Sequence, residues 1–352
     1  MKRVFVGMSG GIDSSAAAFL LKEAGYAVEG VTFVAALETG TKKCCSLEEI
    51  ESARKVCRFL GIPHHVIDLK DVFEARVIRY FVEEYQQGLV PNPCVMCNRH
   101  IKFGALVEES LARGADMVAT GHYARILPVK DGFGLFCGKD TSKDQSYFLS
   151  YVKREMFSYV LLPLGEMTKS EVRKLISDSG MPISSSKTES QDVCFVPGDY
   201  RDYLRARGVK SFAGDFVYQG QVVGKHEGVA FYSLGQRRGL KIAIGKRLYV
   251  RAIDAQNNRI ILGELPKSRK LWLRELNLLV GDFEEGEYEI QLRYQSKRIK
   301  GWATWEEDRL ALFLSQPAEI VTPGQLGVLY RNDQVMAAGI IDKTLLEEED
   351  AV

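Results

Sequence analysis

This sequence predicts an α/β fold class: a parallel-sheet domain followed by two small, mostly-β modules. Strand-like and helix-like segments alternate through the first half of the chain. After about residue 192, short β-like runs alternate with glycine-containing and charged turns. At 352 residues the chain is long enough for about two or three domains of ordinary size. We place the boundaries at 1–195, 196–268 and 269–352.

In the first half, three strand–helix pairs precede a last strand. Each predicted helix ends near a glycine, where helices commonly stop. In the third helix Phe73, Val77, Tyr80, Phe81 and Tyr85 recur at helical spacing, which predicts one buried stripe. Short apolar strands separated by helices favour a parallel sheet covered on both faces, with ligands at the carboxyl ends of the strands. The predicted elements are 4–8, 14–25, 28–34, 47–61, 64–69, 71–88 and 116–123.

In the second half, apolar and polar residues alternate with a period of two, and turn signals are frequent. This pattern predicts small antiparallel barrels or sandwiches. Lys267 to Lys270, in the segment PKSRK, are expected to join two such modules. The predicted β regions are 214–228, 248–263, 286–295, 309–317 and 324–341.

The composition is that of a globular protein, with 46% hydrophobic residues and no apolar stretch near the roughly 20 residues that span a bilayer. The N-terminus enters a strand pattern at once, so we expect a cytoplasmic protein with no membrane partner. The formal net charge is +1, so any affinity for nucleic acid must come from local patches. Seven cysteines without a secretion signal argue against a disulfide framework and for thiol or metal chemistry.

The stretch SGGIDSS, residues 9–15, lies between the first strand and the first helix. In such a loop backbone N–H groups converge on an anion, and the positive end of the helix reinforces them. The stretch lacks the lysine and the spacing of the common NTPase phosphate loop. Asp13 is suited to position Mg²⁺ on a pyrophosphate leaving group. The alternative is a tight turn with a Ser or Asp helix cap, but the strand–loop–helix context favours phosphate binding.

Three cysteines carry the candidate chemistry. Cys94 and Cys97 are separated by two residues, and Cys194 follows much later. A CxxC pair is typical of a redox couple, half of a zinc site or part of an iron–sulfur site. A zinc quartet needs two more ligands, and the sequence has no second CxxC or HxxxH pair to supply them. The remaining cysteines are expected to be core residues or bystanders: Cys44, Cys45, Cys57 and Cys137.

Basic and aromatic residues gather in two stretches far from the glycine loop. Residues 234–247 hold five cations in fourteen residues. Cations track phosphates and aromatic rings stack on splayed bases, as recognition of single-stranded RNA requires. A solvated charged face is the alternative. The second stretch, 292–302, contains Arg293, Tyr294, Lys297, Arg298, Lys300 and Trp302.

Several motifs together resemble one family. GMSGGIDSS is similar to the pyrophosphatase loop of enzymes that adenylate a carbonyl or carboxyl oxygen. ATGHY, KDQSYFL and PNPCVMCNRHIKF narrow the resemblance to the tRNA-specific 2-thiouridylase family (MnmA/TrmU), and LGQRRGL and TPGQ extend it over nearly the whole chain. The resemblance implies an ATP-pyrophosphatase (PP-loop) domain, a central tRNA-binding module and a C-terminal β-barrel. It implies ATP-dependent 2-thiolation of the wobble uridine (position 34) of tRNA, by adenylation of uridine O2 and sulfur transfer through cysteine persulfide.

The resemblance also implies roles for single residues. Cys194 would carry the persulfide, and Cys97 would be its nucleophilic partner. With Asp13 of the glycine loop, these two are the candidate catalytic residues. The implied ATP contacts are Gly7, Met8, Ser9, Gly10, Gly11, Ile12, Asp13, Ser14, Phe33 and Gly121. Near the target base and along the anticodon region of tRNA the implied contacts are Asn92, Pro93, Cys94, His122, Lys143, Asp144, Gln145, Arg293, Tyr294 and Gln325. For His122 the alternative is a structural histidine at a strand end. An upstream sulfur carrier or cysteine desulfurase is the implied protein partner.

The chain departs from the family at Cys94, where an aspartate is commonest. Cys94, Cys97 and Cys194 could together ligate a 4Fe–4S cluster and leave one iron open to bind sulfur. The adenylation chemistry needs only two thiols, so we favour the persulfide route. Two alternatives to the thiolase stay open here: a carboxyl-activating ligase with the same loop, and an RNA-binding module with a structural metal site. Release of pyrophosphate that depends on tRNA would separate all three.

Overall fold

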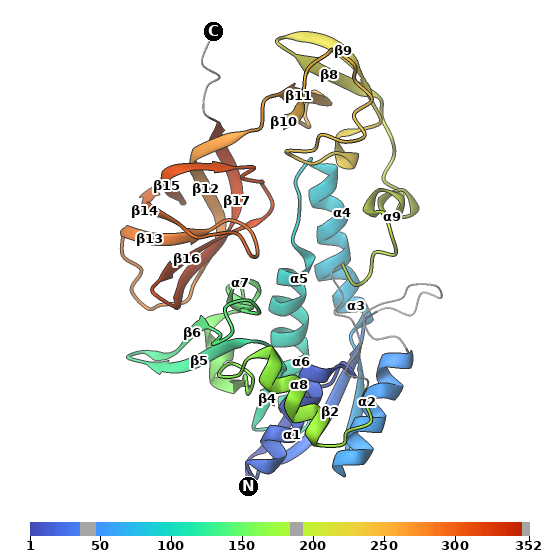
Figure 1. Ribbon diagram of the computed structural model, residues 1–352, viewed down its shortest axis with the longest axis vertical. Helices are drawn as coiled ribbons and strands as arrows, with labels where there is room; N and C mark the ends of the chain where they lie inside the picture. Colours follow the sequence, from blue (N-terminus) through green and yellow to red (C-terminus); the bar gives the residue numbers. More distant parts are fainter. Residues whose placement is uncertain (36–46, 184–192, 347–352) are drawn as a thin grey trace.

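Three units are visible in the computed structural model of the protein, which describes residues 1–35, 47–183 and 193–346 (Figure 1). The N-terminal domain lies at one end of the long axis, and the module of β8–β11 lies at the other. The barrel formed by β12–β17 stands beside the helices that run between them. None of the helices within these residues is long and apolar enough to cross a membrane.

A five-stranded parallel sheet forms the centre of the first domain. Its strand order is β3 (His64–Asp68), β2 (Ala27–Val34), β1 (Arg3–Gly7), β4 (Met117–Ala119) and β7 (Val160–Leu161). The chain runs outward from β1 to β3 and then returns to the other side of β1. The strand order therefore reverses between β1 and β4, and ligands of open α/β sheets bind at such a reversal.

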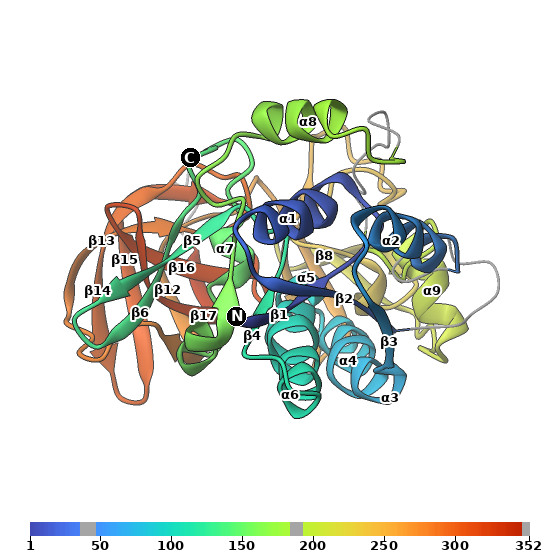
Figure 2. The same cartoon turned by 90° about the horizontal axis from the view of Figure 1, so that it is seen from below.

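Helices cover both faces of this sheet (Figure 2). On one face α1 (Ile12–Glu23), α2 (Leu47–Leu60) and α8 (Lys169–Asp178) pack against Val4 and Val6. The helical segment 70–112 covers the other face, where Phe5 is fully buried. Successive residues of a strand point to opposite faces, so an unbroken apolar strand suits a sheet buried on both sides. Burying a phenylalanine stabilises the fold by about 1.5–3 kcal/mol.

The segment 70–112 places the cysteine pair. Its elements are α3 (Lys70–Phe73), η1 (Glu74–Ile78), α4 (Arg79–Gln86), α5 (Pro93–Met96), η2 (Cys97–Ala105) and α6 (Leu106–Ala112). Both η1 and η2 are π-helical, a form that occurs frequently at functional sites. The predicted stripe is confirmed, because Phe73, Val77, Phe81 and Tyr85 are buried and Tyr80 is half-buried.

The middle module has its own small core. Its sheet runs in the order β10 (Tyr249–Asp254), β11 (Arg259–Gly263), β8 (Gly214–Tyr218) and β9 (Gln221–His226), and the short helices nearby are α9 (Tyr200–Ala206) and η4 (Val229–Phe231). Phe216, Val250 and Ile260 are fully buried in it.

The C-terminal module is a closed barrel. Its strands follow the order β12 (Lys267–Leu278), β15 (Arg309–Glu319), β14 (Ile299–Glu306), β13 (Gly286–Gln291), β16 (Leu326–Arg331) and β17 (Gln334–Leu346). Pairing of β12 with β17 closes the ring, which removes the exposed edges of the sheet. The fold class predicted from the sequence is confirmed.

Two features differ from the sequence prediction. The segment PKSRK is not the joint between the modules: β12 already begins at Lys267, and residues 264–266 connect it to β11. In addition, β5 (Ala124–Val129) and β6 (Gly132–Cys137) form a hairpin of the first domain that extends the barrel sheet through the pair Phe136–Gln334. No pattern predicted this pairing, because its partners lie about 200 residues apart. The helices that follow it are α7 (Ser146–Leu149) and η3 (Arg154–Tyr159).

Candidate active site

The glycine loop after β1 is held by hydrogen bonds within itself and to α2. Ser14 Oγ donates to Gly11 O at 3.1 Å and lies 3.2 Å from Ser9 Oγ. Gly10 has a φ of +68°, and a Cβ there would lie 2.7 Å from both Glu49 O and Ser52 Cβ. Gly10 is therefore required both by its backbone conformation and by its contact with α2. The loop ends where α1 begins, so the positive end of this helix faces any bound anion.

Residues predicted to bind ATP gather at one edge of the sheet. Gly121 follows β4, and a Cβ there would lie 2.6 Å from Asp13 C and 2.8 Å from Ser14 N. Phe33 lies near the carboxyl end of β2, which pairs with β1. The structure thus brings the loop 7–14, Gly121 and this end of β2 to the place where the strand order reverses. The roles of these residues toward ATP stay predictions.

Asp13, in the first turn of α1, holds a buried lysine. Lys169 Nζ lies 2.7 Å from both Asp13 carboxylate oxygens, and Tyr123 Oη donates to Asp13 Oδ1 at 2.7 Å. Only 8% of Lys169 is exposed, so water screens this ion pair less than it screens a surface pair. The loop sequence predicted a Mg²⁺ role for Asp13, but no pattern in the sequence pointed to its partner Lys169.

Lys169 is positioned by the start of α8. Asp140 Oδ2 accepts a hydrogen bond from Lys169 N at 2.9 Å. Thr168 caps the helix in a capping box with Glu171, which satisfies N–H groups that the first turn leaves open. The sequence TKSE, residues 168–171, is therefore a recognisable signal for the start of a helix. No local signal predicts that Lys169 contacts Asp13, which lies 156 residues earlier.

The CxxC pair lies at the start of the helix formed by α5 and η2. Asn92 caps it, since Asn92 Oδ1 accepts a hydrogen bond from Val95 N at 3.4 Å, and Pro93 occupies the first position. Proline is favoured there because that N–H has no helical partner. Cys94 is exposed, whereas Cys97 is buried with 7% of its surface exposed.

Cys194 is half-buried and packs against the hydrophobic cluster that contains Cys97. Phe195, the residue after Cys194, belongs to the same cluster. Within residues 1–35, 47–183 and 193–346, no three His, Cys, Asp or Glu side chains come together as a metal-binding group. The ligand set Cys94, Cys97 and Cys194 for an iron–sulfur cluster stays a prediction. Cys44 and Cys45 lie outside the described residues. Cys57 and Cys137 are buried as expected, and burial raises the pKa of Cys57 to about 11.

His122 connects the glycine loop to the cysteine helix. It follows Gly121, and its ring lies 5.5 Å from that of Phe103 in η2. Its Nδ1 is 2.7 Å from Thr120 Oγ1. Burial, with the charge of Lys102, lowers the pKa of His122 well below its usual value, so the ring is neutral near pH 7.

Two residues predicted to contact tRNA, Asp144 and Gln145, accept hydrogen bonds from the protein backbone. Asp144 Oδ1 accepts hydrogen bonds from Gly138 N at 2.9 Å and Ser146 N at 3.1 Å. Gln145 Oε1 accepts one from Tyr123 N at 2.9 Å. Their polar groups shape the turn before α7, and Lys143, which is half-buried, belongs to the same turn.

Two predicted tRNA residues of the barrel come next to that turn. Tyr294 packs on Phe148 of α7 with ring centroids 4.3 Å apart, and its neighbour Arg293 is exposed. Gln325 of the barrel instead reaches the chain before Asn92, where its Nε2 donates to Val90 O at 2.8 Å.

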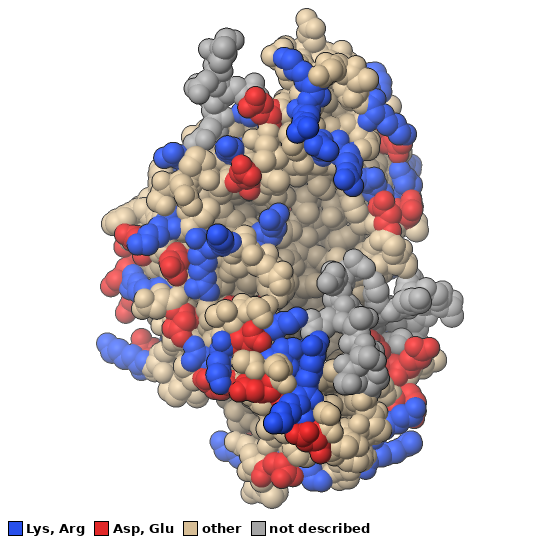
Figure 3. Space-filling view, in the orientation of Figure 1, with Lys and Arg blue, Asp and Glu red and all other residues tan. Residues whose placement is uncertain are grey.

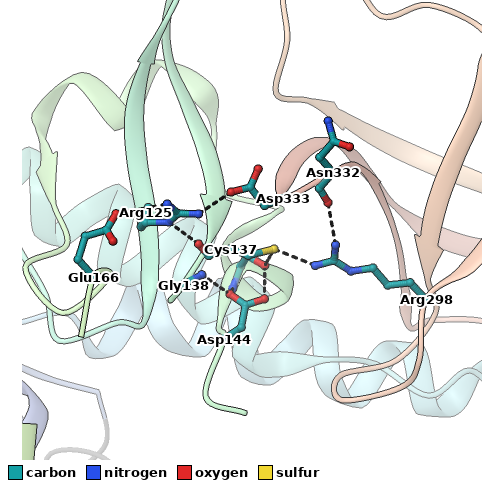
Figure 4. A network of polar contacts seen from close by, with 9 residues as sticks. Arg125, Cys137, Gly138, Asp144, Glu166, Arg298, Asn332 and Asp333 are labelled. Atoms are coloured by element: carbon teal, nitrogen blue, oxygen red, sulfur yellow. Dashed lines mark hydrogen bonds and ion pairs between the residues drawn. The ribbon is translucent and has the colours of Figure 1, made fainter. Parts of the chain in front are cut away.

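A polar network joins the first domain to the barrel (Figure 4). Arg298 Nη2 donates to Cys137 Sγ at 2.8 Å, and the guanidinium stacks 3.5 Å from the centre of the Tyr330 ring. Arg125 pairs with Asp333 at 2.5 Å. Arg298 was counted among the cations of the second basic stretch, but its donors are engaged inside the protein.

The first basic stretch is exposed. Figure 3 shows Lys and Arg side chains gathered over the β8–β11 module on the face that it presents. The cations of residues 234–247 are exposed, namely Arg237, Arg238, Lys241, Lys246 and Arg247. Exposure is what phosphate contacts require.

Three family models match successive parts of the chain. The tRNA methyl transferase HUP domain matches residues 2–198, the tRNA methyl transferase PRC-barrel domain matches 201–264, and the aminomethyltransferase beta-barrel domain matches 268–341. A tRNA-specific 2-thiouridylase MnmA from Moorella thermoacetica is 42% identical over 96% of this chain and 98% of its own. The chain belongs to the tRNA-specific 2-thiouridylase family.

Other 2-thiouridylases match to the same extent. The MnmA of Carboxydothermus hydrogenoformans is 42% identical over 98% of each chain. Among solved structures, the U34-tRNA thiolase NcsA from Methanococcus maripaludis with its 4Fe–4S cluster is 19% identical, with a TM-score of 0.35, and the match covers 58% of this chain and 64% of that one.

Membership in the 2-thiouridylase family confirms the predicted enzyme class, a tRNA-uridine 2-sulfurtransferase. It also supports thiolation of a tRNA uridine by an ATP-using enzyme with a PP-loop. The two alternatives left open by the sequence, a carboxyl-activating ligase and an RNA-binding module without turnover, are set aside.

Proposed function

We propose that the chain thiolates C2 of the wobble uridine, position 34, in two chemical stages. In the first, uridine O2 attacks the α-phosphorus of ATP, pyrophosphate leaves and O2 becomes adenylated. The loop 7–14 and the start of α1 stabilise the negative charge on the pyrophosphate, and Mg²⁺ that enters with ATP adds to this. Lys169, beside Asp13, contributes a further positive charge next to the loop.

In the second stage, sulfur replaces the adenylated oxygen. The terminal sulfur of a persulfide on Cys194 attacks C2, and AMP leaves. The Cys97 thiolate then attacks Sγ of Cys194, which releases the sulfur on uridine as 2-thiouridine and leaves a Cys97–Cys194 disulfide. A cellular thiol reduces this disulfide, and an upstream sulfur carrier or cysteine desulfurase reloads Cys194.

One observation carries the proposal. Gly121 packs against Asp13 of the glycine loop, and the next residue, His122, contacts Phe103 in the helix that Cys97 begins. The loop for the nucleotide and the segment with the nucleophile thus meet at two consecutive residues. Adenylation and sulfur transfer act on one uracil ring, so both groups must reach the same small space.

The experiment separates the two stages. Pyrophosphate release that depends on tRNA reports adenylation, and 2-thiouridine content reports the complete reaction. We expect Cys97→Ser and Cys194→Ser to lose thiolation and to retain pyrophosphate release. Cys57→Ala, a cysteine buried on α2 with no role in the proposed sulfur transfer, is the control and should retain both. A tRNA with cytidine at position 34 should support neither. Full thiolation by Cys97→Ser would refute the assignment of the nucleophile.

A further inference from the structure

The turn Pro323–Gln325 of the barrel lies directly against residues 90–91, which lead into Asn92 and the cysteine helix. Val90 N donates to Pro323 O at 3.0 Å. Gln325 Nε2 donates to Val90 O at 2.8 Å and lies 3.3 Å from Pro91 O. Both polar groups of the Val90 backbone are therefore bonded to the barrel.

Gly324 allows this close approach. A Cβ at Gly324 would lie 2.8 Å from Val90 N and 2.9 Å from Val90 O. Contacts under 3.0 Å with backbone atoms cannot be relieved by rotating a side chain. The φ of Gly324 is +93°, which also favours glycine.

The turn itself is fixed to the barrel. Gly324 N donates to Ile341 O at 2.9 Å, and Ile341 N donates to Gln325 O at 2.8 Å. Ile341 belongs to β17 and is fully buried. The turn therefore moves with the barrel wall and has little freedom of its own.

The middle module holds the same loop at its other end. Gly88 has a φ of +74°, and a Cβ there would lie 2.6 Å from Ile253 Cγ2 in β10. The loop 88–92 is thus fixed by both C-terminal modules immediately before Asn92 caps the helix that carries Cys94 and Cys97.

We propose that Gln325 is a positioning residue for the thiolation reaction, and that the turn Pro323–Gln325 sets the position of the segment Asn92–Cys97. The inference rests on the proposed function, because it takes Cys97 as the nucleophile. A displacement of about 1 Å at a reacting group lowers a rate by about 100-fold. The barrel therefore contributes to catalysis through protein contacts, in addition to any contact with tRNA.

Two variants test this by separate routes. Gln325→Glu keeps the shape of the side chain. It replaces the Nε2 donor with an oxygen acceptor, which then faces the carbonyl oxygens of Val90 and Pro91. Gly324→Ala leaves Gln325 in place and pushes on Val90. Gln316→Ala, an exposed glutamine on β15, is the matched control. The kinetic readouts are kcat and the KM for tRNA in the formation of 2-thiouridine, which includes the stage in which Cys97 acts. The structural readout is hydrogen exchange of the Val90 amide in the full-length protein without tRNA.

We expect both variants to lower kcat by roughly 10- to 100-fold, to leave the KM for tRNA within about twofold, and to speed exchange at Val90. The control should change none of these. A higher KM with unchanged exchange would make Gln325 a tRNA contact and overturn the inference, as would wild-type values throughout. Because exchange is measured without substrate, it stays informative even if Cys97→Ser shows that the proposed nucleophile is wrong.

Discussion

Lys169 Nζ lies 2.7 Å from both carboxylate oxygens of Asp13, so a lysine at the start of α8 is paired with the first turn of α1. The partners differ in exposure: the Lys169 side chain is 10% exposed and that of Asp13 is 33% exposed. Because of this difference, removing one partner is not equivalent to removing the other. A bare carboxylate at position 13 can be hydrated more fully than a buried ammonium at position 169.

The first prediction concerns the stability of this pair. Asp13→Ala should lower the free energy of unfolding by about 2–3 kcal/mol, and Lys169→Met by about 1 kcal/mol. Urea unfolding at pH 7 measures both. The double variant should lose less than the sum of the two single losses, because the residues are in direct contact. Equal losses for the two single variants would contradict the argument from exposure.

The second prediction concerns activity at the same pair. Asp13→Ala should reduce tRNA-dependent pyrophosphate release by at least about 100-fold, because the residue forms part of the nucleotide loop. Affinity for tRNA, measured by filter binding, should stay nearly unchanged. Normal AMP formation by this variant would show that Asp13 has no part in adenylation.

The third prediction concerns tRNA binding by the second basic stretch. Arg293 and Lys297 are exposed, and if they contact phosphates, alanine at both should flatten the log–log salt dependence of binding by about one unit for each lost contact. Arg298→Ala is the comparison, because Arg298 is bonded to Cys137 and stacked on Tyr330. It should lower stability and leave the slope within error of the wild type. If the double variant kept the salt dependence of the wild type, Arg293 and Lys297 would lie on a solvated surface that does not contact phosphates.

The fourth prediction concerns Cys94. The residue is exposed and lies next to Pro93 in the first turn of α5, where a carboxylate interacts favourably with the helix dipole by about 0.3–1 kcal/mol. Cys94→Asp should therefore retain thiolation and slightly raise thermal stability. Iron and labile sulfide are to be measured after anaerobic purification. A stoichiometric cluster lost together with turnover in this variant would establish the cluster route instead.

The fifth prediction concerns the pH dependence of stability through His64. Thr32 Oγ1 donates to Met8 O at 2.7 Å, so His64 Nε2, 2.8 Å away, must donate to Thr32 and Nδ1 is left unprotonated. Nδ1 is buried and has no hydrogen-bond partner among the residues that the structure describes. Burial, reinforced by the charges of Arg54 and His65, lowers the pKa of His64 to about 4.

The unfolded chain, with an ordinary histidine pKa near 6.5, binds this proton more readily than the folded one. The contribution to stability is thus present above pH 6.5 and is lost as the pH falls toward 4, with about 2 kcal/mol lost by pH 5. His64→Gln should reduce the difference in unfolding free energy between pH 7.5 and pH 5. Identical pH profiles would mean that His64 titrates normally in the folded protein.

The parallel-sheet domain could be read from the sequence because its signals are local. The stripe Phe73 to Tyr85 and the loop SGGIDSS each lie within one element or one turn, and short segments favour their structures through propensity and amphipathic packing. The ATP residues from β1, β2 and β4 could be grouped because parallel strands end at a common edge. The same reasoning could not separate Arg298 from Arg293, since both are arginines in one charged run.

By itself, then, the sequence determined the elements, their class, the family motifs and the candidate nucleophiles. Only the tertiary structure decided which distant groups touch: Lys169 with Asp13, Gln325 with Val90, Arg298 with Cys137, and the hairpin β5–β6 with β17. The physical reason is that each of these contacts depends on the relative placement of elements separated by more than 150 residues. Such placement results from packing the complete cores together, and no local preference of the chain encodes it.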